Sequence, residues 1–133
     1  MKKIILLFIF SIFIFCGCKH DRGIILFNYQ PITKENALHN SKHFDRGKKI
    51  YYLFIAPKRM DNKYIRVQIF KMTDKASFGG AEVVRTKDFR LMKDERYYHS
   101  DYFVLYEKGH YYMQVFSTDD FQHPLSIGDF YVK

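Results

Sequence analysis

Residues 64–71 read Tyr-Ile-Arg-Val-Gln-Ile-Phe-Lys, and this stretch sets the expected fold. Ile65, Val67 and Ile69 fall on one side of an extended chain, because successive side chains of a β-strand point to opposite faces. The arginine and the glutamine between them fall on the other side. One apolar face and one polar face are typical of a strand that is half buried in an antiparallel sheet. The stretch therefore predicts a sheet that packs on a core with one face only.

Short apolar or alternating runs recur along the chain on both sides of this stretch. They predict further strands at residues 24–29, 50–56, 81–85, 102–106, 110–117 and 127–132, with 81–85 at a sheet edge. We expect the run at 50–56 to form a hairpin with 64–71, and the run at 102–106 to form a second hairpin with 110–117. Residues 33–44 fit either a short helix or a polar loop, and the charged segment 87–100 is expected to cross between sheets. Short strands separated by turns predict an all-β fold, a small antiparallel β-sandwich.

The two C-terminal runs also predict which side chains enter the core. Tyr111, Met113 and Val115 share one face of the run at 110–117, and Phe130 and Val132 share one face of the last run. These five side chains are expected to point inward, because the period of a strand is two residues. The aromatic residues at positions 112, 116 and 131 would then point outward.

One short pattern carries a resemblance to a known family. The pattern Tyr106-x-x-Gly109-x-Tyr111-x-x-x-Val115 resembles the tyrosine corner of immunoglobulin-like and fibronectin-type sandwiches, with Tyr106 where those domains usually carry leucine. The resemblance implies that the Tyr111 hydroxyl bonds to the backbone just upstream and fixes the start of a core strand. It also implies an immunoglobulin-like sandwich in which Gly109 and Tyr111 form a structural corner.

The N-terminal segment has a different character from the rest of the chain. Lys2 and Lys3 precede an apolar run over residues 4–15, which covers roughly 18 Å at about 1.5 Å per helical residue and is too short for a bilayer core of about 30 Å. This arrangement is typical of a secretory signal. The end of the run, Phe15-Cys16-Gly17-Cys18, resembles the lipobox of bacterial lipoproteins, with Phe15 where leucine is usual. A simple secreted protein and an uncleaved anchor stay open as alternatives.

The resemblance to lipoproteins divides the chain into three parts. Residues 1–17 would be the signal peptide, Cys18 the lipidated first mature residue, and 18–23 a short tether before a sandwich domain at 24–133. A five-residue extended segment spans at most about 18 Å, so the domain would stay close to its bilayer. With Cys18 as the one cysteine after the signal, the domain has no partner for an intrachain disulfide and no cysteine-based zinc site.

The chain carries no pattern typical of an enzyme. It contains no Gly-x-Ser-x-Gly elbow, no His-Glu-x-x-His motif and no phosphate-binding glycine loop. His39 and His43 have a spacing that could hold a metal on a helix, but no convincing third ligand lies near them, and we interpret them as surface residues. We therefore predict a protein without catalytic residues, cofactor or bound metal.

Two surfaces are candidates for binding. The first is a basic cluster of Lys58, Arg59, Lys63 and Arg66, which could meet lipid head groups or an acidic partner, or could be an ordinary solvated loop. The second is formed by the outward aromatic residues, above all Tyr112 and Phe116, because contiguous exposed apolar area often marks an interface.

Together these patterns predict a lipid-anchored protein of the cell envelope that acts by binding. We expect it to attach to a bacterial membrane through lipid on Cys18, on the periplasmic face, as a non-enzymatic binding or accessory module of a larger envelope complex. Its partner would be another envelope protein, and nucleic acid is not expected, because an exported lipoprotein does not normally meet it. The alternative is a surface-displayed lipoprotein that binds an external ligand or a host component.

Replacing Cys18 tests the lipid anchor. The Cys18→Ala variant should no longer incorporate labelled fatty acid, and it should leave the membrane fraction, because the sulfur that carries the lipid is gone. Labelling of whole cells followed by fractionation measures both effects. Unchanged labelling would contradict the lipoprotein interpretation and would point to Cys16 or to an uncleaved helix.

Overall fold

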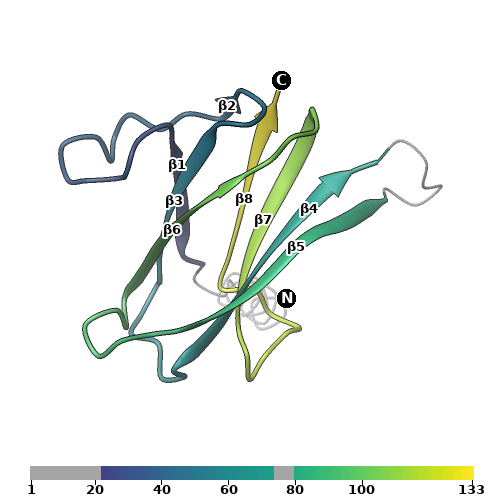
Figure 1. The fold of residues 1–133 in the computed structure, drawn as a ribbon. Coiled ribbons are helices and arrows are strands. Elements are labelled where there is room, and N and C mark those ends of the chain that lie inside the picture. The colour runs from purple at the N-terminus through teal and green to yellow at the C-terminus, as the bar shows by residue number, and fades with distance from the viewer. Residues whose placement is uncertain (1–21, 74–79) are drawn as a thin grey trace, which may run out of the picture.

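The structure, a computed structural model, describes residues 22–73 and 80–133, and within these ranges it is a sandwich of two β-sheets (Figure 1). The strands are β1 (Ile24–Asn28), β2 (His43–Phe44), β3 (Lys49–Ile55), β4 (Tyr64–Met72), β5 (Ala81–Arg90), β6 (Tyr98–Val104), β7 (Gly109–Ser117) and β8 (Ser126–Val132). The predicted signal peptide, Cys18 and the first residues of the tether lie outside the described residues. Over the described ranges we find no helix of the length and apolarity that crossing a membrane requires.

The two sheets differ in size. Three strands form one sheet in the order β1-β3-β6, and five form the other in the order β2-β8-β7-β4-β5. All pairs are antiparallel except β2 with β8, where two residues of each strand pair in parallel. The prediction of an all-β sandwich is therefore confirmed.

The predicted hairpin between the runs at 50–56 and 64–71 is wrong. β3 pairs with β1 and β6 in the small sheet, whereas β4 pairs with β5 and β7 in the large one. The connection between them crosses from sheet to sheet, a separation of about 10 Å that several extended residues can span. Apolar or alternating residues along a run indicate that a strand is buried, but they are the same for a hairpin and for a crossing.

The second predicted hairpin, between 102–106 and 110–117, is wrong for the same reason. β6 ends at Val104 and pairs with β3, and β7 begins at Gly109 in the other sheet. The edge strand expected at 81–85 is present, but it extends to Arg90, with nearly all its residues exposed. Residues 91–97, the middle of the charged segment, make the crossing that was predicted for 87–100.

Residues 33–44 form a loop that ends in the short strand β2, so the second of the two predicted alternatives holds. The Asn36 side chain shapes this loop: its Oδ1 accepts a hydrogen bond from the backbone of Thr33, and its Nδ2 donates to the carbonyl of Pro31. Such local hydrogen bonds between side chain and backbone favour turns over helices.

The core lies between the two sheets, and aromatic rings dominate its centre. Phe130 on β8 is fully buried, and its ring centroid lies 4.9 Å from that of Phe27 and 5.4 Å from that of Phe103, both on the small sheet. Within the large sheet it lies 5.5 Å from Tyr111 and 6.2 Å from Phe44. Tilted and edge-on pairs at these separations add to the free energy gained from burial. The predicted inward faces of the two C-terminal runs are all buried.

Tyr111 has the geometry that the tyrosine-corner resemblance implies. Its ring is buried, and its hydroxyl donates a hydrogen bond of 2.7 Å to the carbonyl oxygen of Glu107. The Glu107 carboxylate in turn accepts one of 2.7 Å from Lys71 on β4. A Cβ atom at Gly109 would lie 2.9 Å from Cε of Lys71, so glycine leaves room for the lysine to reach Glu107. The corner thus ties the crossing between β6 and β7 to the large sheet.

Removing the corner hydroxyl should destabilise the domain. Tyr111→Phe loses a hydrogen bond made by a buried side chain, which typically contributes about 1 kcal/mol, so the denaturation midpoint should fall. Tyr112→Phe is the matched control, because Tyr112 lies half buried on the outer face and its hydroxyl makes no recorded hydrogen bond to the described residues. Chemical denaturation of the two purified variants measures the difference. A larger loss for Tyr112→Phe would show that the strand register is shifted by one.

Candidate functional site

The described chain begins at one end of the sandwich, beside the loop before β8. The backbone N–H of Gly23 donates to the carbonyl of Leu125 at 2.8 Å, and the Ser126 hydroxyl donates to the Gly23 carbonyl at 2.6 Å. Ser126 is buried, and its hydrogen bond to Gly23 is partly shielded from water. The two hydrogen bonds hold Gly23 against the loop before β8.

Three crossing or turning segments meet at this end, residues 56–63, 91–97 and 118–125, and we call it the loop end (Figure 1). The N–H of Met60 donates to the carbonyl of Arg96 at 2.8 Å, which joins the first two segments. The Asn62 amide donates to the hydroxyl of Thr118 at 2.8 Å and to that of Ser117 at 3.2 Å, which joins the first and the third. The loop end is therefore held by cross-links between its segments.

Three members of the predicted basic cluster are exposed at the loop end. Lys58 and Arg59 lie in the first segment and Lys63 lies at its end. Across the described part of the chain, no carboxylate lies within ion-pairing distance of these three side chains. Their charges are therefore available to a partner.

Arg66 differs from the other three. It lies on the outer face of β4, where its Nε and Nη2 donate to the two carboxylate oxygens of Asp88 on β5 at 2.8 and 3.1 Å. This hydrogen-bonded pair holds the pKa of Asp88 below its usual value. The guanidinium also lies 4.6 Å from the ring centroid of Phe121. Arg66 is thus engaged within the domain, which the sequence did not reveal because Asp88 is 22 residues away.

A cavity of about 440 Å³ opens at the loop end. Residues 57–62, with Ile65, line one part of it, and residues between 117 and 125 line the rest. Lys58 and Arg59 belong to the first set, and Asp119 and Asp120 to the second. Ligand sites in proteins commonly have volumes of about 300–1,000 Å³, so the size suits a small molecule.

The carboxylates of this cavity are partly held by their own loop. Asp120 accepts hydrogen bonds from the backbone of Gln122 and His123 and from the His123 ring. Burial acts to raise the pKa of Asp120, but these hydrogen bonds outweigh it and keep the pKa below the usual value. Asp119 accepts a hydrogen bond from the Ser117 hydroxyl through one of its oxygens. Both side chains are therefore ordered, and Asp120 is ionised at neutral pH.

The predicted aromatic surface needs a correction at Phe116. Phe116 does point outward, but only 7% of it is exposed, because residues of the third segment cover it. The ring of Phe121 lies over it at a centroid distance of 6.1 Å. The run of polar residues around position 121 gave no sign that a loop would fold back on the sheet. Phe116 is thus not available as a binding residue.

Tyr112 belongs to a row of rings on the same outer face. The centroid of His110 lies 4.8 Å from that of Tyr112 and 4.2 Å from that of Tyr131, and Tyr131 stacks in turn on His43 at 5.2 Å. Asp129 lies beside the row, 2.9 Å from Nε2 of His110, and this hydrogen bond together with that from a lysine lowers the pKa of Asp129. His43, Tyr131 and His110 thus form a stack, and the Tyr112 ring is tilted against His110 by 43°.

One histidine of the described chain lies in the core. His99 is buried and lies 3.2 Å from the Tyr52 hydroxyl through Nε2. Burial lowers the pKa of His99 and raises the pKa of Tyr52, so both are neutral at pH 7 and the tyrosine donates to the histidine. Residues 22–73 and 80–133 contain no group of three His, Cys, Asp or Glu side chains that could hold a metal ion.

Comparisons with known proteins identify similar structures. No protein-family model and no curated protein matches the chain. An immunoglobulin-like protein from Pseudomonas aeruginosa is 15% identical, with a TM-score of 0.48 over 88% of this chain and 100% of that one. A β-glucosidase from Listeria innocua is 11% identical, with a TM-score of 0.43 over 87% of this chain and 17% of that one. The DNA glycosylase AlkC from Pseudomonas fluorescens is 10% identical, with a TM-score of 0.42 over 90% and 33%.

Single substitutions of the basic residues distinguish a charge that stabilises the fold from charges that have no partner in the domain. Arg66→Gln should lower the denaturation midpoint, because it leaves Asp88 unpaired and removes the cation from the Phe121 ring. Lys58→Gln is the control and should leave the midpoint unchanged. The effect of Arg66→Gln should shrink in concentrated salt, because ions screen exposed pairs. Equal effects of the two substitutions would contradict the assignment of Arg66 to the fold.

Proposed function

We propose that this protein is a lipid-anchored lipoprotein of the bacterial cell envelope that acts as a non-enzymatic binding or accessory module of a larger envelope complex. The anchor is the lipid on Cys18, and the domain faces the periplasm. The lipobox-like sequence Phe15-Cys16-Gly17-Cys18 supports the anchor. Its partner is another envelope protein, and the domain contributes binding surfaces without catalytic residues.

The observation that carries this proposal is the hydrogen bonding of Gly23 at the loop end. With an extended reach of at most about 18 Å between Cys18 and Gly23, a lipid on Cys18 would keep the loop end close to the bilayer. Lys58, Arg59 and Lys63 would then lie within reach of anionic head groups, whose attraction falls off over a Debye length of about 8–10 Å. The opposite end of the sandwich and the two outer faces would be left for a protein partner.

The proposal assigns no catalytic role, and the hydrogen bonds of two histidines support this choice. His99 and Tyr52 hydrogen-bond to each other in the core and are both held neutral. His110 is engaged by Asp129. A general base needs an accessible group with a pKa near the working pH, and these histidines are paired instead.

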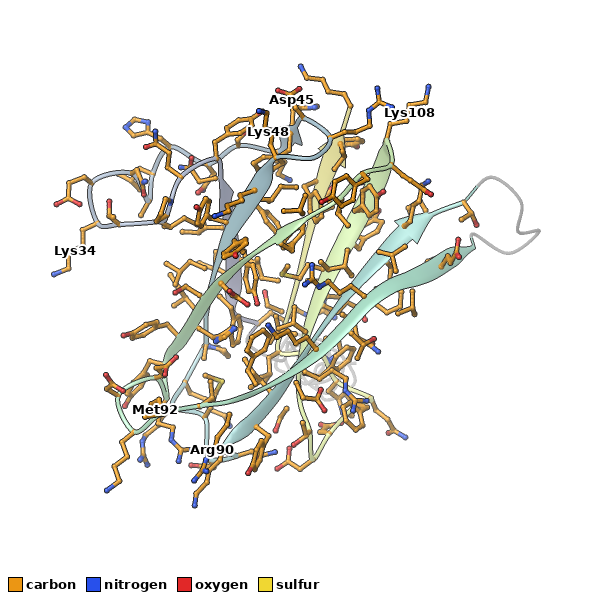
Figure 2. All side chains as sticks on the ribbon, in the orientation of Figure 1. Lys34, Asp45, Lys48, Arg90, Met92 and Lys108 are labelled. Carbon is orange, nitrogen blue, oxygen red and sulfur yellow. The ribbon has the colours of Figure 1, made fainter. Side chains whose placement is uncertain are left out.

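The orientation on the membrane gives the sharpest test of the proposal. Lys48 and Met92 are exposed residues near opposite ends of the sandwich (Figure 2), so Lys48→Cys and Met92→Cys, each labelled with the same fluorophore, form a matched pair. In the full chain reconstituted into vesicles that contain a lipid-linked quencher, the label at position 92 should be quenched much more strongly than the label at position 48. Equal quenching, or stronger quenching at position 48, would contradict the proposed orientation.

The alternative, display on the cell surface, is separated by protease accessibility. If the domain faces the periplasm, protease added to intact cells should not cleave it. Cleavage should begin only after the outer membrane is permeabilised. Cutting in intact cells would favour a surface-displayed lipoprotein that binds an external ligand or a host component.

A further inference from the structure

The cavity at the loop end combines charges of both signs with an apolar floor. Met60 and Ile65 are buried beneath it, with 7% and 1% of each residue exposed. The Asn62 amide bridges to Ser117 and Thr118 and holds the two lining segments together. The cavity is therefore built by packed and hydrogen-bonded residues, and its shape does not depend on a ligand.

The basic groups of the cavity are Lys58 and Arg59. Both are exposed, and within the described ranges neither lies within ion-pairing distance of a carboxylate. Arginine and lysine are the side chains that bind phosphate oxygens most strongly, through charge-assisted hydrogen bonds. This part of the cavity suits a phosphate group.

The acidic groups are Asp61, Asp119 and Asp120. Asp120 is held by its own turn, whereas the one recorded hydrogen bond to Asp119 among the described residues uses Oδ1 and leaves Oδ2 open. A carboxylate oxygen next to a phosphate site suits a primary ammonium group, which carries three N–H donors. An anion alone would face three carboxylates in this cavity, and a cation alone would face Lys58 and Arg59.

We infer that this cavity binds a phosphodiester that carries a primary ammonium group, the chemistry of a phosphatidylethanolamine head group in the membrane beneath the domain. Lys58 and Arg59 bind the phosphate, Asp119 binds the ammonium, and the glycerol carbons lie against Ile65. The choice of a membrane lipid over a free solute rests on the proposed anchoring, because the hydrogen bond from Gly23 to Leu125, a residue of the cavity wall, puts Gly23, the last residue of the proposed tether, beside the cavity.

A titration with the soluble head group tests the inference. The full chain in maltoside micelles, which contain no phosphate, is titrated with glycerophosphoethanolamine, and binding is followed by chemical shifts of the backbone amides at the loop end. We expect saturable binding, with glycerophosphate at least about tenfold weaker because it lacks the ammonium group. No saturable binding, or equal binding of the two compounds, would overturn the proposal.

Matched variants assign the two halves of the ligand. Asp119→Asn should weaken glycerophosphoethanolamine by about tenfold and leave glycerophosphate unchanged or bound more tightly. The double variant Lys58→Gln/Arg59→Gln should weaken both compounds. Lys34→Gln, in an exposed loop away from the loop end (Figure 2), is the control and should change neither. Equal losses in the control would overturn the assignment.

A second arm separates the membrane lipid from a free solute. In vesicles of phosphatidylcholine, whose quaternary ammonium has no N–H to donate, added glycerophosphoethanolamine should still titrate the cavity. In vesicles that contain phosphatidylethanolamine it should not, because the lipid already fills the site. An undiminished titration in the second vesicles would overturn the membrane source.

The failure of this inference can be told apart from the failure of the lipid anchor. The Cys18→Ala variant in micelles should bind glycerophosphoethanolamine like the unmodified sequence, because the cavity residues are unchanged. If the wild-type protein binds glycerophosphoethanolamine but carries no lipid label, the proposed lipid anchor is wrong and the proposed cavity ligand still holds. Labelling without binding would remove the cavity assignment and leave the anchor in place.

Discussion

The packing of the Phe130 ring between the two sheets is the interaction on which the rest of the sandwich depends. It lies on a central strand of the large sheet and contacts Phe27 and Phe103 of the small sheet at centroid distances of 4.9 and 5.4 Å. Rings of this size bury much apolar area, and their burial requires that the two sheets close over them. The chain crosses between the two sheets at residues 56–63 and 105–108, where two hairpins were expected. The Tyr111 hydroxyl fixes one of these crossings through Glu107.

Sequence alternation predicted the buried faces of the strands well, because it reflects contact with a core and nothing beyond. Ile65, Val67 and Ile69 are buried as expected. The run at 50–56 is apolar throughout and gave no alternation, yet in the structure only alternate residues of β3, such as Phe54, are buried. Which strand lies beside which depends on contacts between residues far apart in the chain, and no local pattern contains that information. The strand predicted at 81–85 was too short for a related reason. β5 is an edge strand, and its exposed residues need not alternate between apolar and polar.

The candidate site was predicted less completely than the fold. Lys58, Arg59 and Lys63 are exposed, as predicted. Arg66 was predicted to be available because it is close to them in sequence, and Phe116 because it lies on the outer face of its strand, but neither is available in the structure. Asp88 and Phe121, which engage them, come from β5 and from the loop before β8. Asp119 and Asp120 were not predicted as site residues, because only the folded chain places them in the same cavity as Lys58 and Arg59. The lipid anchor was predicted from residues outside the described part of the structure, so it rests on the sequence alone.

The two ends of the sandwich carry different features. The loop end receives the chain at Gly23 and holds the mixed-charge cavity, and the other end carries the tyrosine corner and the loop before β3. On the outer face of the large sheet, His110 stacks on Tyr131, and Arg66 forms an ion pair with Asp88. At the loop end, Lys58, Arg59 and Lys63 have no ion pair with any described carboxylate.

Amide hydrogen exchange on the full chain tests most directly whether the loop end meets the membrane. Exchange in lipid vesicles is compared with exchange in detergent micelles, residue by residue, so that each amide serves as its own reference. The account predicts slower exchange in vesicles at 57–63, 91–97 and 118–125, with no change at 45–48 and 105–108. Slower exchange at 45–48 and 105–108 instead, or along the outer face of β7 and β8, would contradict it.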